Sequence, residues 1–152
     1  MPPLCLNRWR RFSILLMSNI TFPAKFEFLD EIREFVAQVA REGGFTEKEI
    51  YSLQLAADEA ASNIIEHAYE GIANGSLDIN CNMQGDKLVI TMRDSGRPFD
   101  PSKVKQPNLK ADLSNRQIGG LGVYLMRKLM DEVSYVSNSR TGNLLTMTKR
   151  RG

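Results

Sequence analysis

The sequence has few of the residues from which metal sites and disulfide frameworks are built. It contains one histidine, His67, and two cysteines, Cys5 and Cys81, which lie far apart in the chain. A structural zinc site needs several closely spaced Cys or His ligands, so no such site is expected. Distant cysteines in a chain without a secretory signal favour a reducing compartment, and we expect a cytoplasmic protein.

The sequence also lacks a strong excess of either charge and any long hydrophobic run. The 20 Lys and Arg residues are nearly balanced by 18 Asp and Glu residues, which leaves a net charge of +2. Much of the basic excess lies at the two ends of the chain, and no basic stripe with interleaved aromatic residues runs through its middle. Direct binding of nucleic acid is therefore not expected. The apolar run FSILLM at 12–17 is far too short to span a bilayer, and the small net charge gives no strong attraction to a membrane surface. No membrane partner is therefore expected for the domain.

The length of 152 residues fits one domain with a core of its own. Residues 1–16 combine two prolines with a basic cluster, which is unlike the start of a compact domain, whereas Met17 makes a natural start. We expect residues 1–16 to be a flexible or mis-assigned N-terminal extension, with a weakly amphipathic membrane-touching segment as the less favoured alternative. Residues 17–152 are expected to form the domain.

Hydrophobic periodicity and turn residues predict the order of the elements. Thr46 and Glu49 have the spacing of a capping box, which marks the start of the second helix. Gly85-Asp86 and the later segment Thr141-Gly142-Asn143 have the character of hairpin turns. The polar, proline-containing span 97–117 shows little periodicity and is typical of a mobile lid or binding loop. The predicted strands are 18–23, 76–83, 87–93, 133–137 and 144–149, and the predicted helices are 28–42, 46–69 and 121–130.

Hairpin-linked strands with few crossovers indicate a mainly antiparallel sheet. The helices then have to cover one face of that sheet to bury their apolar stripes. The sequence therefore predicts an α+β fold, a two-layer sandwich with helices on one face of the sheet and a lid over the site.

The helix through Leu53–Gly71 has an apolar stripe and a polar side. At about 100° per residue the apolar positions share one broad face, whereas Glu59, Asn63 and Glu70 lie opposite it. Residues 59 and 63 are neighbours on the helix surface, so their carboxylate and carboxamide can converge on one ligand, such as a hard cation with phosphate oxygens. A solvated polar face is the alternative. The stripe consists of Ile50, Leu53, Ala57, Ala60, Ala61, Ile64 and Ala68.

Two later motifs favour a nucleotide. Asp94-Ser95-Gly96 follows a predicted strand, where a carboxylate can accept a hydrogen bond from an exocyclic amine and a glycine lets a flat ring approach the backbone. The segment 119–122, GGLG, opens a predicted helix, where backbone N–H groups can face an anion. Each motif alone is also explained as an ordinary turn or helix start, and their combination describes a purine and phosphate site.

These residues together resemble the ATP-binding domain of the GHKL superfamily, which includes gyrase, heat-shock chaperone, histidine kinase and mismatch-repair ATPases and has the Bergerat fold. The segments EAASNIIEHAYEG and GGLGVYLMRKLMDEVSY are similar to those of the anti-sigma-factor serine/threonine kinases of bacterial partner-switching systems. The resemblance covers nearly all of 17–151. It implies binding of ATP with Mg²⁺.

The resemblance also implies roles for individual residues. Glu59 matches the acidic general base, and Asn63 matches the Mg²⁺ ligand of the same motif. Asp94 matches the carboxylate that binds the adenine amino group, and Gly96 matches the glycine packed against the base. The phosphate-holding glycines correspond to Gly120 and Gly122.

Other positions near these motifs have expectations of their own. Arg116 precedes the glycines and is expected either to touch a phosphate or to be merely solvated, while His67 is expected to pack rather than to catalyse. Asp58 is expected to be a surface or capping partner and not a second base. The superfamily often has Gly-Thr where this chain has Gly142-Asn143, so any contact that the threonine makes is in question here.

The resemblance implies a kinase that sequesters a sigma factor and phosphorylates a serine of a small anti-anti-sigma (STAS) protein. It also implies a homodimer. One alternative is a non-catalytic ATP-binding switch module that regulates a protein partner. Another is a detached histidine-kinase catalytic domain, which would transfer phosphate to a histidine of its partner.

Overall fold

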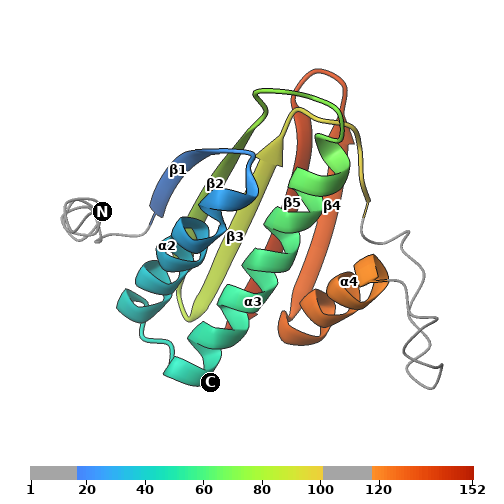
Figure 1. Ribbon diagram of the computed structural model, residues 1–152. Coiled ribbons are helices and arrows are strands. Elements are labelled where there is room, and N and C mark those ends of the chain that lie inside the picture. Colours follow the sequence, from blue (N-terminus) through green and yellow to red (C-terminus); the bar gives the residue numbers. More distant parts are fainter. Residues whose placement is uncertain (1–16, 101–117) are drawn as a thin grey trace, which may run out of the picture.

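The computed structural model describes residues 17–100 and 118–152, and it shows one sheet with helices packed on one face (Figure 1). Residues 1–16 and most of the predicted lid, 101–117, lie outside the described part. The elements in chain order are β1 (Met17–Pro23), the 3-10 turn η1 (Phe26–Phe28), α2 (Leu29–Glu42), α3 (Glu47–Asn63), the π-helical turn η2 (Ile64–Ala68), β2 (Ser76–Gln84), β3 (Lys87–Asp94), α4 (Ile118–Leu129), β4 (Glu132–Asn138) and β5 (Gly142–Arg150).

The five strands pair in the order β1-β2-β3-β5-β4, and every pairing is antiparallel. The predicted α+β two-layer architecture is confirmed, and β1 lies at one edge of the sheet. Because β5 lies between β3 and β4, the start of β5 runs beside the end of β3. In this register Asn143 lies opposite Asp94 on one side and opposite Ser137 on the other.

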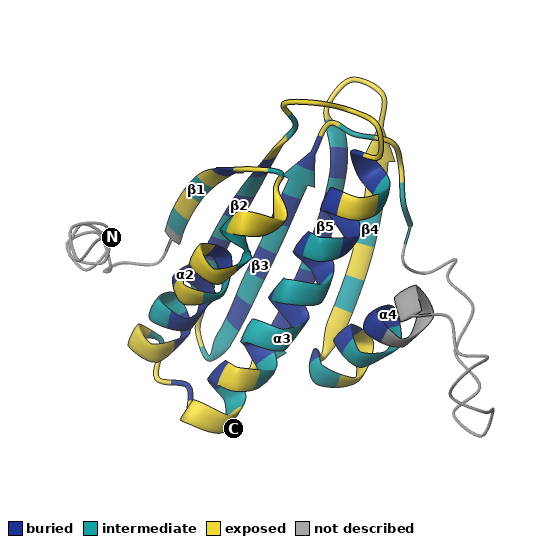
Figure 2. Ribbon diagram, in the orientation of Figure 1, coloured by how far each residue is buried: buried dark blue, intermediate teal, exposed yellow. Residues whose placement is uncertain are grey.

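The core lies between the sheet and the helices, and α3 and the strands behind it carry many buried residues (Figure 2). The predicted apolar stripe is confirmed, since all seven of its residues are buried. Alanine at 56, 57, 60 and 61 leaves little side-chain bulk between the helix axis and the strands. A helix with such a face can approach a sheet closely, which brings the polar positions next to the stripe close to the ends of the strands.

The predicted start of α3 is confirmed by its capping box. The Thr46 hydroxyl accepts a hydrogen bond from the Glu49 backbone N–H at 3.2 Å, and the Glu49 carboxylate accepts one from the Thr46 N–H at 2.8 Å. At its other end α3 changes to the π-helical turn η2. A π-helical turn shifts the direction of the following side chains relative to a continuous α-helix, and such turns are frequent at functional sites.

Three boundaries differ by more than one residue from the sequence prediction. Helix α3 ends at Asn63 instead of 69, because the π-helical turn η2 follows it. Helix α4 begins at Ile118 instead of 121, so the glycines at 119, 120 and 122 lie within its first turns. The second hairpin turn also closes earlier than predicted, because Gly142 and Asn143 belong to β5 and pair with Asn138 and Ser137. Gly142 has φ +86°, which the turn into β5 requires.

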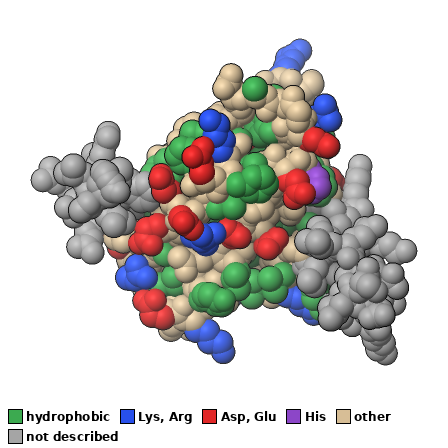
Figure 3. Space-filling view, in the orientation of Figure 1, with side chains coloured by type: hydrophobic (Ala, Val, Ile, Leu, Met, Phe, Trp, Pro, Cys, Tyr) green, Lys and Arg blue, Asp and Glu red, His purple; other side chains and the backbone are tan. Residues whose placement is uncertain are grey.

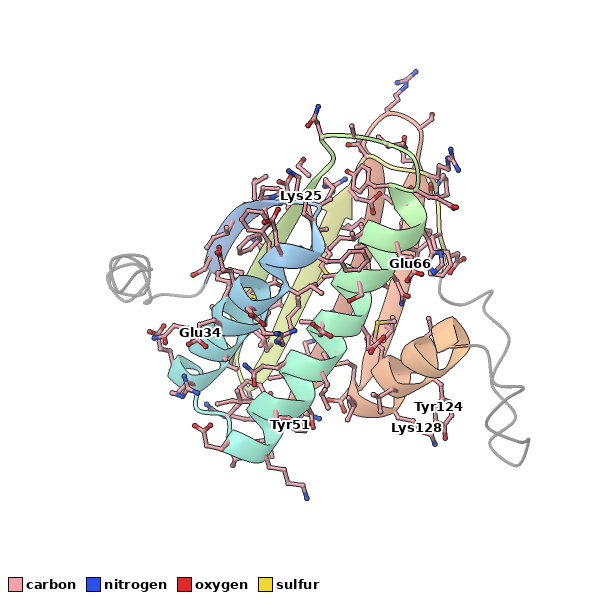
Figure 4. The ribbon with its side chains drawn as sticks, viewed as in Figure 1. Lys25, Glu34, Tyr51, Glu66, Tyr124 and Lys128 are labelled. Carbon is pink, nitrogen blue, oxygen red and sulfur yellow. The ribbon has the colours of Figure 1, made fainter. Side chains whose placement is uncertain are left out.

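Acidic side chains gather on the helical face of the molecule, over α2 and α3 (Figure 3). Helix α4 carries a different surface feature, in which the Lys128 ammonium lies 5.6 Å from the centre of the Tyr124 ring (Figure 4). In the described part of the chain, no helix has both the length and the apolar character needed to cross a membrane.

Candidate functional site

A pocket lies where α3 and η2 meet the end of β3 and the first half of β5, and α4 and β4 contribute one lining residue each. Its empty volume is about 340 Å³, which includes space open to solvent. Asn63 and Asp94 form two polar walls of the pocket, Tyr135 contributes a ring with a hydroxyl group, and the other lining residues are apolar. The lining residues are Ala60, Asn63, Ile64, Ala68, Asp94, Phe99, Met126, Tyr135 and Leu145. The structure therefore brings two of the predicted site residues to one cavity.

Asn63 ends α3 and is buried, with 8% of its surface exposed. The alternative of a solvated polar face is therefore wrong for this residue. Its side chain makes no hydrogen bond to any other residue that the structure describes. A buried carboxamide has an acceptor oxygen and two donors to satisfy, so this side chain is available to a ligand in the pocket.

Glu59 lies one helical turn before Asn63, on the side of α3 that faces α4. A side chain at Gly122 would overlap the Glu59 carboxylate, so this glycine lets the backbone of α4 pass directly beside that carboxylate. Burial raises the pKa of Glu59, and the neighbouring Asp58 carboxylate raises it further. A carboxylate with a raised pKa is a stronger proton acceptor than an ordinary surface glutamate.

Asp94 is 5% exposed at the end of β3, and its Oδ1 is held by two donors. The Gly96 backbone N–H donates to this oxygen at 2.9 Å, and the Asn143 side-chain amide donates to it at 2.8 Å. Burial raises the pKa of Asp94, whereas the hydrogen bonds from Asn143 and Gly96 act in the opposite direction. Since Oδ1 is occupied, Oδ2 is the oxygen left for a ligand.

Gly96 follows Asp94 and packs against the end of η2. A Cβ atom at this position would overlap the Ala68 carbonyl group, and the next residue, Arg97, donates its N–H to that carbonyl at 2.7 Å. Only glycine fits this approach. The segment after β3 is therefore held against the same turn that follows Asn63, which fixes the distance between the two polar walls of the pocket.

Two tyrosine hydroxyls also fix this segment, and neither was predicted from the sequence. Tyr69 accepts a hydrogen bond from the Ser95 N–H at 2.8 Å and donates to the Ser76 carbonyl at 2.7 Å. Tyr135, which lines the pocket, accepts from the Phe99 N–H at 2.8 Å. A buried tyrosine needs a partner for its hydroxyl, but the partner's identity depends on the strand register and not on any local sequence signal.

His67 and Asp58 make the contacts expected of a packing residue and of a surface partner. His67 stacks on Phe99, with the ring centres 4.6 Å apart and the planes 19° apart, so it packs over the start of the lid segment. Asp58 pairs with Arg33, which also pairs with Asp30, so it ties α3 to α2. Arg116 lies outside the described residues, and Gly120 is described only as part of the α4 backbone.

Comparison with known proteins identifies the class to which this fold and pocket belong. The family model described as the histidine kinase-like ATPase domain matches residues 22–149. The chain belongs to this family. Its nucleotide is therefore ATP, the substrate of an ATPase family.

Individual relatives narrow the class. The serine-protein kinase RsbW of Bacillus subtilis is 36% identical over 133 residues, which cover 84% of this chain and 81% of that protein. RsbW of Bacillus pumilus is 37% identical over 138 residues, covering 86% of this chain and 83% of that protein. Within the histidine kinase-like ATPases, the chain is thus a member of the RsbW family of serine-protein kinases.

Solved structures agree on the fold. The crystal structure of the RsbU and RsbW domains of Rv1364c from Mycobacterium tuberculosis matches with a TM-score of 0.64 at 17% identity, covering 90% of this chain and 32% of that longer one. The catalytic domain of the histidine kinase ThkA matches with a TM-score of 0.52 at 15% identity, covering 88% of this chain and 96% of that one.

Proposed function

We propose that this protein binds and sequesters a sigma factor and uses ATP to phosphorylate a serine of an anti-anti-sigma (STAS) protein. The observation that carries the proposal is the meeting of Asn63 and Asp94 in one pocket, with the Glu59 carboxylate a helical turn away. Membership in the RsbW family supports the serine as acceptor.

In this proposal Asp94 recognises the adenine. Its Oδ2 accepts a hydrogen bond from the exocyclic amino group, while Oδ1 stays bound to Gly96 and Asn143. An ionised carboxylate accepts and does not donate, so it favours the amino group of adenine over the carbonyl oxygen of guanine. Gly96 lets the segment after β3 pack against Ala68, beside the place proposed for the base.

The proposal includes Mg²⁺ at Asn63. The buried side-chain oxygen of Asn63 suits a hard cation, and the described residues contain no group of three or more His, Cys, Asp or Glu side chains that would hold one unaided. Magnesium commonly takes one or two protein ligands and completes its shell with phosphate oxygens and water. When bound, the ion would neutralise charge on the phosphates.

Glu59 is proposed as the general base. Its carboxylate would take the proton of the acceptor serine hydroxyl as the serine oxygen bonds to the γ-phosphorus and the bond to the ADP oxygen breaks. Gly120 and Gly122 are proposed to hold the phosphates with the backbone at the start of α4, and Arg116 to contact one of the phosphates. A homodimer that engages the sigma factor is part of the same proposal.

Phosphate transfer to a purified STAS partner tests the function. We expect acid-stable phosphoserine on the partner and formation of ADP in equal amount, together with a complex of the protein and a sigma factor in size-exclusion chromatography. Bound ATP without phosphorylation of any STAS protein of the same organism would instead indicate a non-catalytic switch module. Acid-labile phosphate on the partner would indicate a histidine-kinase domain.

The raised pKa of Glu59 gives a pH prediction. A general base works only when deprotonated, so kcat should fall as the pH drops through the pKa of Glu59, and this fall should begin at a higher pH than for an ordinary glutamate. Asp58→Asn removes the neighbouring negative charge, lowers the pKa of Glu59 and should move the acid limb of the kcat profile to lower pH.

The matched control is Asp30→Asn. This variant also takes a carboxylate from Arg33, but Asp30 lies on α2 and is not among the groups that raise the pKa of Glu59. Its acid limb should coincide with that of the wild type. Equal shifts in the two variants would contradict a direct charge effect of Asp58 on Glu59.

A further inference from the structure

Asn143 stands where the superfamily often has threonine, and its side chain lies at the centre of a small buried network. It is 2% exposed near the start of β5. The side-chain Nδ2 donates to Asp94 Oδ1 at 2.8 Å and to the Gly96 carbonyl at 3.0 Å. The side-chain Oδ1 accepts from the Ser137 hydroxyl at 2.8 Å. Both N–H groups and the oxygen of the amide are therefore used.

These partners allow one orientation of the amide. Asp94 Oδ1 and the Gly96 carbonyl oxygen are both acceptors, so an amide turned over would place its own oxygen against two others. Ser137 can donate its hydroxyl proton only to an acceptor, and Asn143 Oδ1 provides that acceptor from the neighbouring strand β5. Partners on β4, on β3 and just after β3 thus hold this side chain of β5 in one position.

The network acts on the two residues that form the adenine end of the pocket. With Gly96 N–H and Asn143 both on Oδ1, the Asp94 carboxylate cannot rotate about its Cβ–Cγ bond without losing two hydrogen bonds. Its Oδ2 is then fixed in direction. The bond from Asn143 to the Gly96 carbonyl fixes the backbone beside the base at the same time. A threonine has one hydroxyl proton and cannot donate to both groups at once.

We propose that Asn143 is a positioning residue for nucleotide recognition, which orients the Asp94 carboxylate and the Gly96 backbone so that the pocket selects a purine with an exocyclic amino group. This inference rests on the proposed function, because it assigns a role at the same adenine end of the pocket. Asn143 itself acts through Asp94 and Gly96.

Asn143→Asp tests the proposal, because it has nearly the same shape but no N–H donors. At neutral pH it also places a second carboxylate against Asp94. A hydrogen bond to a charged group contributes enough that its loss should raise KM for ATP by about 10- to 100-fold, while kcat at saturating ATP stays within about threefold. The matched control is Asn82→Asp on β2, which makes the same change in a half-buried residue away from the pocket and should leave both constants unchanged.

The ratio of the affinities for ATP and inosine triphosphate shows whether Asn143 orients Asp94 for recognition of the base or only stabilises the strand that carries it. Inosine triphosphate has a carbonyl oxygen in place of the amino group, so the wild type should prefer ATP, and Asn143→Asp should bring the ratio of dissociation constants towards one. A structural role would weaken both nucleotides equally. A folded Asn143→Asp protein with the wild-type ratio would overturn the inference.

Ser137→Ala keeps the test valid if Asn143→Asp does not fold, since Ser137 is an exposed residue whose loss leaves the core intact. It removes the donor that holds Asn143 Oδ1 and should lower the ATP preference by a few-fold in the same direction. An unchanged preference in Ser137→Ala would then overturn the inference. Wild-type protein that binds no ATP would overturn the proposed function as well, whereas normal ATP binding with an unchanged ratio would overturn only the role of Asn143.

Discussion

Glu59→Gln is expected to lower kcat for serine phosphorylation by about 10²- to 10⁴-fold, the contribution typical of a general base. Glutamine has the size and shape of glutamate, so it can occupy the same space beside Gly122. Its carboxamide does not accept a proton at neutral pH. Glu59 does not line the pocket that holds Asn63 and Asp94. The substitution should therefore remove an interaction with the transition state only, and the dissociation constant for ATP should change by less than about threefold.

Single-turnover phosphorylation of the STAS partner measures this change, and titration with a fluorescent ATP analogue measures the affinity. Glu66→Gln is the matched control, because Glu66 is an exposed glutamate in the π-helical turn after the same helix (Figure 4). This variant should retain wild-type kcat. Loss of kcat in both variants would point to a disturbed helix. An unchanged kcat in Glu59→Gln would show that Glu59 is not the base.

The fold could be predicted where local chemistry and tertiary packing agree. The capping box at Thr46 and the apolar stripe of α3 are local features, and the structure keeps both. The start of α4 was predicted too late because glycines have low helix propensity and are read as helix starts, whereas here they lie inside the first turns. Asn143 was predicted as a turn residue because Thr-Gly-Asn has turn character, but pairing with Ser137 and Asp94 places it in a strand.

The candidate site was predictable in its residue types but not in its burial. Periodicity at a constant angle per residue put Asn63 on a polar face, and the structure buries it where α3 gives way to the π-helical turn. No propensity scale predicts such a turn from one sequence. The partners of the Tyr69 and Tyr135 hydroxyls could not be assigned either, because the N–H groups of Ser95 and Phe99 that donate to them are far away in the chain.

Asp94→Asn is expected to weaken ATP binding by about 100-fold without lowering stability, because the two oxygens of Asp94 have different roles. In this variant the carbonyl oxygen of the introduced carboxamide can still accept from the Gly96 N–H and from Asn143, so the internal network survives. The new amide N–H₂ then takes the place of Oδ2 and faces the adenine amino group, donor against donor. Loss of a hydrogen bond to a charged group and an unpaired buried donor together give an effect of this size.

The same substitution that weakens ATP binding should leave the folded protein as stable as the wild type or more stable. Burial raises the pKa of Asp94 above that of an exposed aspartate, which means that the folded protein disfavours the ionised form. The folding free energy attached to this group is therefore greatest at low pH and is lost as the pH rises through its pKa. Asparagine carries no charge, so Asp94→Asn should unfold at the same temperature as the wild type or higher at neutral pH.

Thermal unfolding with and without Mg-ATP measures both effects in one experiment, because a ligand raises the unfolding temperature only if it binds the folded state. ATP should raise the unfolding temperature of the wild type and of the control Asp78→Asn, whose carboxylate accepts a hydrogen bond from Thr21 at 2.6 Å in the neighbouring strands. ATP should leave the unfolding temperature of Asp94→Asn nearly unchanged. For the wild type, the ATP-induced rise should also shrink on acidification, since protonated Asp94 no longer offers a charged acceptor. A variant that unfolds early yet still gains the full rise with ATP would show that Asp94 supports the sheet and does not recognise the base.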